Sequence, residues 1–211
     1  MTGTLANLVT TSWGEACHDL SILRRLFSTV GNNVFWDGKW DDIPNTTQGA
    51  AKAIQPLSPL FFNVHAAAGR KAIERAVANK GHSKVLGVTV LTSIDPDECQ
   101  SIFGDVPRKV VIRFAGMLLE EGADGIICSP QELTILRQQP ALQELLMITP
   151  GIRPAWAAAS DQKRVMTPGE AVKAGADYLV IGRPITQPPK ETGSPVTAAN
   201  LIAEEITSAL R

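Results

Sequence analysis

Four ionisable side chains lie within six positions of the segment FWDGKWDDIPNT, residues 35–46: Asp37, Lys39, Asp41 and Asp42. In an extended strand, residues two positions apart point to the same side, so Asp37 and Lys39 should point together and Asp42 should lie in the loop beyond. A lysine held between carboxylates is a protonated acid in a fixed position. The segment therefore predicts either a site of acid catalysis or a solvated cluster of salt bridges at a strand edge.

A second group of candidates lies in two loops near the C-terminal end of the sequence. One loop begins with TPGIRP and contains Gln162, and the other contains Gly182 and Arg183. Glycine lets a backbone approach a ligand closely, and a guanidinium can bind a phosphate through two parallel hydrogen bonds. These loops predict a phosphate site, with a surface salt bridge of Arg183 as the alternative.

Two further residues follow apolar runs. Ser93, in the segment LTS, can face the edge of a planar ring or can simply cap a strand. His65, after FNV, can act as a general base, but a hydrogen-bonded core histidine is the more common arrangement. The four tryptophans show no spacing typical of a stacking platform, so nucleic-acid binding is not favoured.

Short apolar runs place these candidates at the C-terminal ends of strands. The runs are 34–37, 60–65, 85–91, 124–128, 146–149 and 178–182. Amphipathic segments between them predict helices, and this alternation indicates parallel strands with crossover helices. A (β/α)8 TIM barrel is favoured over a doubly wound sheet, because polar residues follow nearly every run and no G-x-G-x-x-G is present. A barrel needs eight strands, and residues 4–10 can supply one more at most.

The composition is that of one soluble domain, expected to span residues 1–211. The net charge is −1, and no run of basic residues favours nucleic acid or a membrane surface as a partner. Three cysteines at irregular spacing predict neither a disulfide framework nor a metal site, so we expect a reducing, cytoplasmic environment. No apolar run reaches the roughly 18 residues of a membrane helix.

Taken together, the motifs resemble those of the orotidine 5′-monophosphate decarboxylase family. The matching segments cover about residues 34 to 187 in the family's order: DGKWDDIPNT, NVHAAAGR, VTVLTS, DGIICSPQE, TPGIRP, SDQKRVMTP and DYLVIGRPIT. The resemblance implies decarboxylation of orotidine 5′-monophosphate to uridine 5′-monophosphate in pyrimidine biosynthesis, by a carboxy-lyase that uses neither a metal nor an organic cofactor.

The resemblance also implies a role for each matching residue. Lys39 would protonate C6 of the pyrimidine, and Asp37 would lie beside the substrate carboxylate. Asp42 would be donated across a homodimer interface into the partner's site, with Thr46 near the ribose. The remaining substrate-binding roles would fall to Ser93 at the pyrimidine, Pro150 at the start of a closing loop, and Gln162, Gly182 and Arg183 at the 5′-phosphate.

The sequence departs from the family's pattern at its N-terminal end. The family's first strand, with a ribose-binding aspartate, is not found, and Met1 stands where a K-x-G lysine would be. Gly38 and Asp41 replace a bulkier apolar residue and a histidine. We therefore expect a barrel that is incomplete at this end and is weakly stable or obligately oligomeric.

Two alternative functions stay open beside the decarboxylase. One is a non-catalytic homologue that binds nucleotide phosphates. The other is a magnesium-dependent sugar-phosphate decarboxylase of the same superfamily, which shares D-x-K-x-x-D. The segments DIPNT and DQKR favour the orotidine enzyme over this second alternative.

Overall fold

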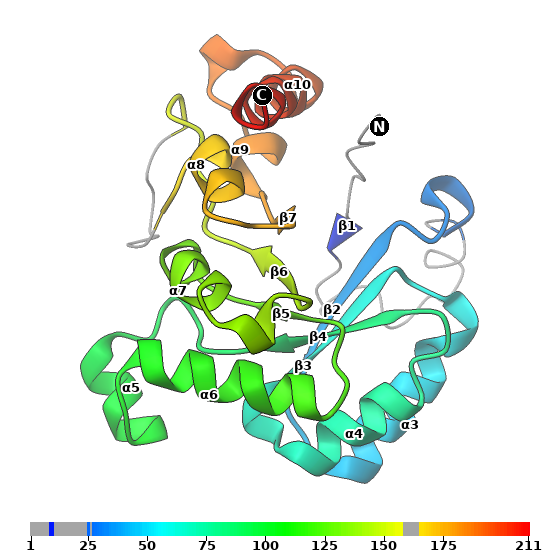
Figure 1. Ribbon diagram of the computed structural model, residues 1–211. Helices are drawn as coiled ribbons and strands as arrows, with labels where there is room; N and C mark the ends of the chain where they lie inside the picture. The colour runs from blue at the N-terminus through cyan, green and yellow to red at the C-terminus, as the bar shows by residue number, and fades with distance from the viewer. Residues whose placement is uncertain (1–8, 11–24, 26, 158–164) are drawn as a thin grey trace. The chain divides into compact units, whose positions relative to one another are not determined.

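A computed structural model describes residues 9–10, 25, 27–157 and 165–211 (Figure 1). The expectations about Met1 and Gln162 therefore lie outside the described residues. The chain divides into two compact units, one formed by Met1–Val88 and Met117–Gly125 and the other by Thr89–Gly116 and Ile126–Arg211. We call them unit 1 and unit 2. The expectation of one domain over residues 1–211 stays a prediction.

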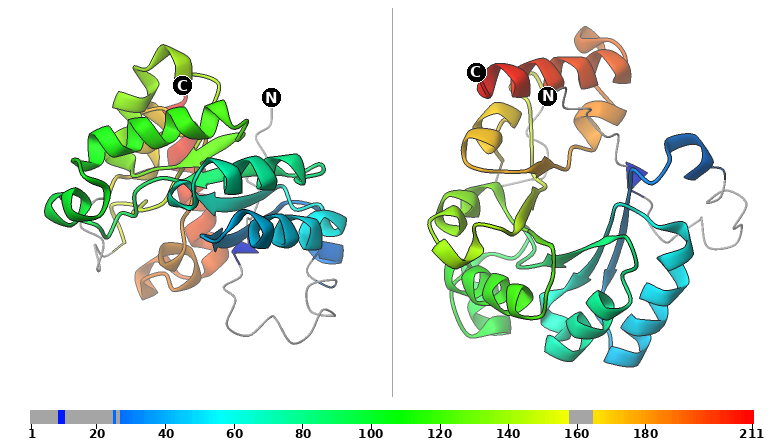
Figure 2. Two further views of the ribbon diagram at one scale, coloured as in Figure 1. Left: turned by 90° about the horizontal axis from the view of Figure 1, so that it is seen from below. Right: turned by 45° about the vertical axis from the view of Figure 1, so that its right-hand side comes forward.

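Unit 1 contains parallel strands paired in chain order, with helices beside them. The strands are β1 (Val9–Thr10), β2 (Val34–Trp40), β3 (Phe61–His65) and β4 (Lys84–Val88). Helices α3 (Pro44–Ile54) and α4 (Arg70–Ala78) pack against each other on the same side of β2–β4 (Figures 1 and 2), and short 3₁₀ turns η1 (Gln55–Leu57) and η2 (Ala66–Ala68) join the elements.

Aromatic packing holds β2 against β3. The rings of Phe35 and Phe61 meet edge to face with centroids 6.1 Å apart, and the rings of Trp40 and Phe62 lie 5.1 Å apart. All four side chains are buried. Such pairs stabilise a sheet beyond the area that they remove from water, so the apolar run at residues 34–36 is anchored before the charged residues begin.

Unit 2 contains shorter strands and most of the remaining helices. Its strands are β5 (Gly125–Ile127), which begins at the last residue of unit 1, β6 (Leu146–Thr149) and β7 (Tyr178–Leu179). β6 and β7 pair in parallel, and the N–H of Cys128 donates to the carbonyl of Ile148 at 3.2 Å. The helical elements are α5 (Pro96–Phe103), α6 (Pro107–Glu120), η3 (Pro130–Glu132), α7 (Leu133–Arg137), η4 (Pro140–Leu142), α8 (Pro168–Lys173), α9 (Arg183–Thr186), η5 (Lys190–Thr192) and α10 (Pro195–Ala209). The last residues of α6, from Met117 on, belong to unit 1.

Local capping explains where several of these helices begin and end. Thr167 and Glu170 form a capping box at the start of α8, and the hydroxyl of Thr167 accepts the N–H of Glu170 at 3.3 Å. Gly175 follows α8 with a φ of 105°, a conformation that side chains rarely adopt. The segment after Ser129 begins as the 3₁₀ turn η3 and continues as α7.

All six predicted strands are present, and β6 has the predicted bounds, whereas the bounds of the others differ. β2 continues past the predicted residue 37 to Trp40, whereas β4 ends at Val88 and β7 at Leu179, short of the predicted residues 91 and 182. The last two differences leave more polar backbone in loops at the carboxyl ends of strands, where sites in parallel α/β proteins form. Across the described ranges, every helix is too short or too polar to cross a membrane.

Candidate functional site

The charged segment of unit 1 lies at the C-terminal end of β2. There the Nζ of Lys39 forms an ion pair with Oδ2 of Asp37, and the two side chains are 50% and 22% exposed. Lys39 has a φ of 46°, in the left-handed region that few residues with a side chain adopt. The pairing of β2 with β3 shifts register between Trp36 and Trp40. The strand therefore bends at the point where the ion pair forms.

Asn63 of β3 links the two members of this ion pair. Its Nδ2 donates to Oδ1 of Asp37 at 2.6 Å, and its Oδ1 accepts the backbone N–H of Lys39 at 2.6 Å. The side chain is fully buried. Asn63 was not among the predicted site residues. A polar residue inside the apolar run FFNVH was nevertheless a signal, because buried amides need hydrogen-bond partners.

His65, at the end of β3, lies close enough to this cluster to feel its charges. Burial is the largest influence and lowers the pKa of the imidazole, and the ammonium of Lys39 acts in the same direction. The carboxylates of Asp41 and Asp37 act in the opposite direction and raise it. The net lowering favours a neutral imidazole near neutral pH, which is the form that can accept a proton.

Asp42 lies in the loop that leads into α3, and Thr46 lies in the first turn of that helix. Oδ1 of Asp42 accepts the N–H of Ile43 at 2.7 Å, and both Asp42 and Thr46 are exposed. They line a pocket of about 310 Å³, whose walls also include residues 38–41, Thr47 and Ala50. Lys39 belongs to this lining, so an open, charged concavity lies beside the ion pair.

The close approach of Trp40 explains why position 38, in the wall of this pocket, is a glycine. A Cβ at this position would lie 2.6 Å from Nε1 of Trp40, so a side chain at position 38 would displace the indole. Trp40 is 8% exposed, and the described residues provide no acceptor for its Nε1. The departure noted at position 38 is therefore coupled to the bulky residue at position 40.

The structure places the other candidates in unit 2. Ser93 is exposed in a turn closed by a 3.1 Å hydrogen bond from the N–H of Ile94 to the carbonyl of Leu91. Pro150 directly follows β6 and is half-buried, whereas Gly182 and Arg183 are exposed where α9 begins. Gln162 lies outside the described residues.

Backbone contacts hold both ends of the loop that follows Pro150. Ile152 forms an isolated parallel bridge with Met166, and the N–H of Arg153 donates to the carbonyl of Met166 at 3.0 Å. Gly151 turns the chain with a φ of 81°. Backbone hydrogen bonds therefore hold the first and last residues of the loop next to each other.

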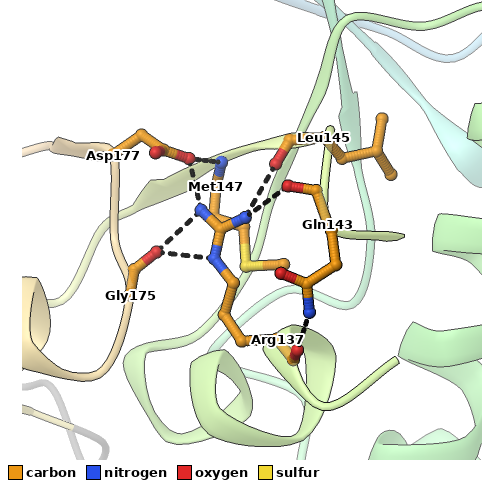
Figure 3. Close-up of polar contacts among 6 residues, drawn as sticks. All are labelled: Arg137, Gln143, Leu145, Met147, Gly175 and Asp177. Atoms are coloured by element: carbon orange, nitrogen blue, oxygen red, sulfur yellow. Dashed lines mark hydrogen bonds and ion pairs between the residues drawn. The ribbon is translucent and has the colours of Figure 1, made fainter. Parts of the chain in front are cut away.

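Unit 2 contains another ion pair, between Arg137 and Asp177, and its arginine makes many more hydrogen bonds than Lys39 does (Figure 3). Arg137 ends α7, and all five of its guanidinium N–H groups have acceptors. Nε and Nη2 donate to the carbonyl of Gly175 at 2.9 and 2.8 Å, and Nη2 also reaches Oδ2 of Asp177 at 2.5 Å. Nη1 donates to the carbonyls of Gln143 and Leu145 at 3.1 and 3.3 Å. With its donors saturated, Arg137 is suited to hold loops together and not to bind a ligand.

The buried thiol of Cys128 is suited to packing and not to nucleophilic chemistry. Cys99 and Cys128 are buried, and neither forms a disulfide bond within the described residues. Burial is the main reason that the pKa of the Cys128 thiol is raised to about 12. A thiol with so high a pKa stays protonated at neutral pH and is a weak nucleophile.

Comparisons with known proteins agree with the motifs and the fold. Residues 11–199 match the model of the family described as "Orotidine 5'-phosphate decarboxylase / HUMPS family". The orotidine 5'-phosphate decarboxylase of Geotalea daltonii is 41% identical over 87% of this chain and 78% of its own length, and that of Halorhodospira halophila is 44% identical over 85% and 76%.

Solved structures give the same result. The crystal structure of orotidine 5'-phosphate decarboxylase from Lactobacillus acidophilus matches with a TM-score of 0.74 and 33% identity, covering 89% of this chain and 81% of that one. The enzyme from Pyrococcus horikoshii matches with a TM-score of 0.68 and 25% identity, over 89% and 80%. These matches confirm the predicted α/β fold of the TIM-barrel type and the predicted family resemblance.

Proposed function

The chain belongs to the orotidine 5'-phosphate decarboxylase / HUMPS family, and we propose that it decarboxylates orotidine 5′-monophosphate to uridine 5′-monophosphate in pyrimidine biosynthesis. The observation that carries the proposal is the ion pair of Asp37 and Lys39, held at the end of β2 by Asn63. It combines an ammonium that can donate a proton with a carboxylate that can lie beside a substrate anion.

The reaction that this pair supports needs one proton at one carbon atom. The bond between C6 and the carboxylate carbon breaks, its electron pair stays on C6, and carbon dioxide leaves. The ammonium of Lys39 then gives a proton to C6 and is protonated again from water. Asp37 holds the ammonium in place and lies beside the substrate carboxylate, so that departure of the carboxylate relieves a repulsion between like charges. The step draws on side chains alone and needs no cofactor.

The other candidates have binding roles in this proposal. In unit 1, Thr46 contacts the ribose. In unit 2, Ser93 contacts the pyrimidine and Pro150 begins the loop that closes over the substrate. Gln162, Arg183 and the backbone of Gly182 hold the 5′-phosphate. Binding the phosphate, which does not react, helps the chemical step by keeping the loop closed.

The proposal includes a cytoplasmic homodimer in which Asp42 enters the partner's site. The exposure of Asp42 in the pocket of unit 1 supports this arrangement, as does the apolar side chain of Ile43, which is 65% exposed beside it. Mixing inactive Lys39→Ala and Asp42→Ala chains tests it. Hybrid dimers would contain one intact site, so activity should return to about a quarter of the unsubstituted level, as expected for random pairing in a two-fold dimer. Mixtures that stay inactive would argue against a shared site.

A direct assay tests the reaction itself. Loss of the ultraviolet absorbance of orotidine 5′-monophosphate should follow addition of the purified chain, and the product should be uridine 5′-monophosphate with one equivalent of carbon dioxide. Binding of uridine 5′-monophosphate is measured in parallel by calorimetry. Nucleotide binding without turnover would overturn the proposed reaction and favour a non-catalytic binding protein.

A further inference from the structure

Asn63 is a fully buried amide whose two ends meet the two members of the ion pair. Its NH2 group faces a carboxylate oxygen of Asp37, and its oxygen faces the N–H of Lys39, each at 2.6 Å. Turning the amide by 180° would set two donors against each other and two acceptors against each other. The chemistry of its neighbours therefore defines the orientation of the Asn63 side chain.

Both contacts act on the geometry of the ion pair. The bond to Oδ1 of Asp37 leaves Oδ2 directed at the ammonium of Lys39. The bond from the N–H of Lys39 holds a backbone with a φ of 46°, which costs free energy unless neighbouring groups stabilise it. One side chain thus supports both the direction of the carboxylate and the strained backbone from which the lysine extends.

We propose that Asn63 is a positioning residue that aims the ammonium of Lys39 by holding Asp37 and the Lys39 backbone at once. This inference rests on the proposed decarboxylation. Asn63 itself does not touch the substrate in this scheme. Its contribution is to keep the proton donor within reach of the reacting carbon, and a displacement of about 1 Å in such a group can cost about 100-fold in rate.

The side chain at position 63 has to be both donor and acceptor. A carboxylate there would accept the N–H of Lys39 but would repel Asp37, and an apolar residue would leave both partners without a bond. Two carboxylates in one site raise the pKa of one of them, because both cannot easily be ionised together. Asn63→Asp should therefore need a higher pH to reach the state with Asp37 ionised.

The experiment compares kcat and KM over a range of pH for the unsubstituted chain, Asn63→Asp and Asn63→Ala. We expect kcat to fall by about 100-fold in both variants, with a much smaller change in KM. The acid limb of the pH profile should move to higher pH in Asn63→Asp alone. A purely structural role would lower the fraction of folded protein without moving the pH profile, and that result would overturn the proposal.

Ile73→Val is the matched control in the same unit. Ile73 is fully buried in α4, so the substitution loosens packing without removing a hydrogen bond. It should leave the pH profile unchanged. If Asn63→Ala does not fold, Asn63→Asp carries the test, because its side chain has nearly the same shape as asparagine.

A second measurement needs no substrate, so it separates this inference from the proposed function. Hydrogen exchange at the Lys39 amide, followed by NMR, should be slow in the unsubstituted chain and in Ile73→Val, and at least tenfold faster in Asn63→Ala. Fast exchange in Asn63→Ala together with no turnover by the unsubstituted chain would overturn the proposed reaction and leave the contact established. Unchanged exchange would overturn the positioning role.

Discussion

Two ion pairs, one in each unit, use similar side chains in different ways. In unit 1, Lys39 meets Asp37 at the end of β2, and its side chain is half-exposed beside a pocket. In unit 2, Arg137 meets Asp177 before β7, and every guanidinium N–H already has an acceptor (Figure 3). Under the proposed function, the two pairs differ in the hydrogen-bond donors left over for a substrate and not in the charge itself.

The position of each pair along its strand agrees with this interpretation. Asp37 and Lys39 lie at the carboxyl end of β2, whereas Asp177 precedes β7 and accepts the N–H of Met147 in β6 at 2.7 Å. In barrel proteins, the carboxyl ends of strands carry the chemistry, and residues at the amino ends mainly contribute stability. We therefore predict that disrupting the pair of Asp37 and Lys39 mainly lowers turnover, whereas disrupting the pair of Arg137 and Asp177 mainly lowers the free energy of unfolding.

The largest effect is expected for Lys39→Ala. Removing the proton donor should lower turnover by about 10³-fold or more, near the upper part of the range for general acid catalysis. The half-exposed pair contributes little to folding, so the free energy of unfolding should change by less than about 1 kcal/mol. The ultraviolet assay and urea denaturation measure the two quantities. A large loss of stability with normal turnover would contradict a catalytic role for the pair of Asp37 and Lys39.

Arg137→Ala should show the opposite pattern. It removes the guanidinium donors from the carbonyls of Gly175, Gln143 and Leu145. Asp177 loses its ion pair and keeps the N–H of Met147, so we expect a loss of about 2–3 kcal/mol in unfolding free energy. Turnover per folded molecule should stay the same. The matched control is Arg108→Ala, an exposed arginine of the same unit, which should change stability by no more than about 0.5 kcal/mol.

Lys80→Met tests a similar contact in unit 1, in which an aspartate joins a basic side chain to the backbone N–H of a neighbouring strand. Oδ2 of Asp124 accepts the N–H of Val85 at 2.8 Å and the Nζ of Lys80 at 2.7 Å, as Asp177 does with Met147 and Arg137. Lysine supplies one bond here where arginine supplies five. We expect a loss of about 1 kcal/mol, measured by urea denaturation, which is less than for Arg137→Ala. Equal losses would show that saturation of the guanidinium adds nothing.

The smallest effect concerns pH and His65. Because burial lowers the pKa of His65 in the folded chain, the unfolded chain binds more protons between that lowered pKa and the usual value of 6.5. Stability should therefore fall as pH drops below 6.5. His65→Gln removes this titration, so urea midpoints measured from pH 7.5 to 5 should decline less steeply for the variant. Parallel declines would mean that His65 does not titrate differently on folding.

Much of the local structure could be predicted from sequence. Each strand coincides with an apolar run, and the residue types of the capping box of Thr167 and Glu170 mark the start of α8, because these signals depend only on neighbours in the chain. The ends of strands were less predictable. β2 continues through charged residues to Trp40, because that ring packs on Phe62 and keeps the chain paired with β3.

The contacts that link distant residues were not accessible from the sequence. Asn63 and Asp37 are 26 positions apart, and Arg137 and Asp177 are 40 apart. The residue types suggested a candidate pair at Asp37 and Lys39, but they did not identify the amide that orients it. They also did not show that every guanidinium donor of Arg137 has an acceptor.

The sequence by itself determined which segments form strands and helices, which charged residues lie at the ends of strands, and to which family the chain belongs. These properties follow from hydrophobic pattern, capping residues and motifs, all of which are read along the chain. The tertiary structure alone decided which polar groups meet. It brings β3 beside β2 with Val64 opposite Trp40, and this register places the buried amide of Asn63 between Asp37 and the backbone of Lys39. Register between strands depends on packing across the whole sheet, so local sequence cannot determine it.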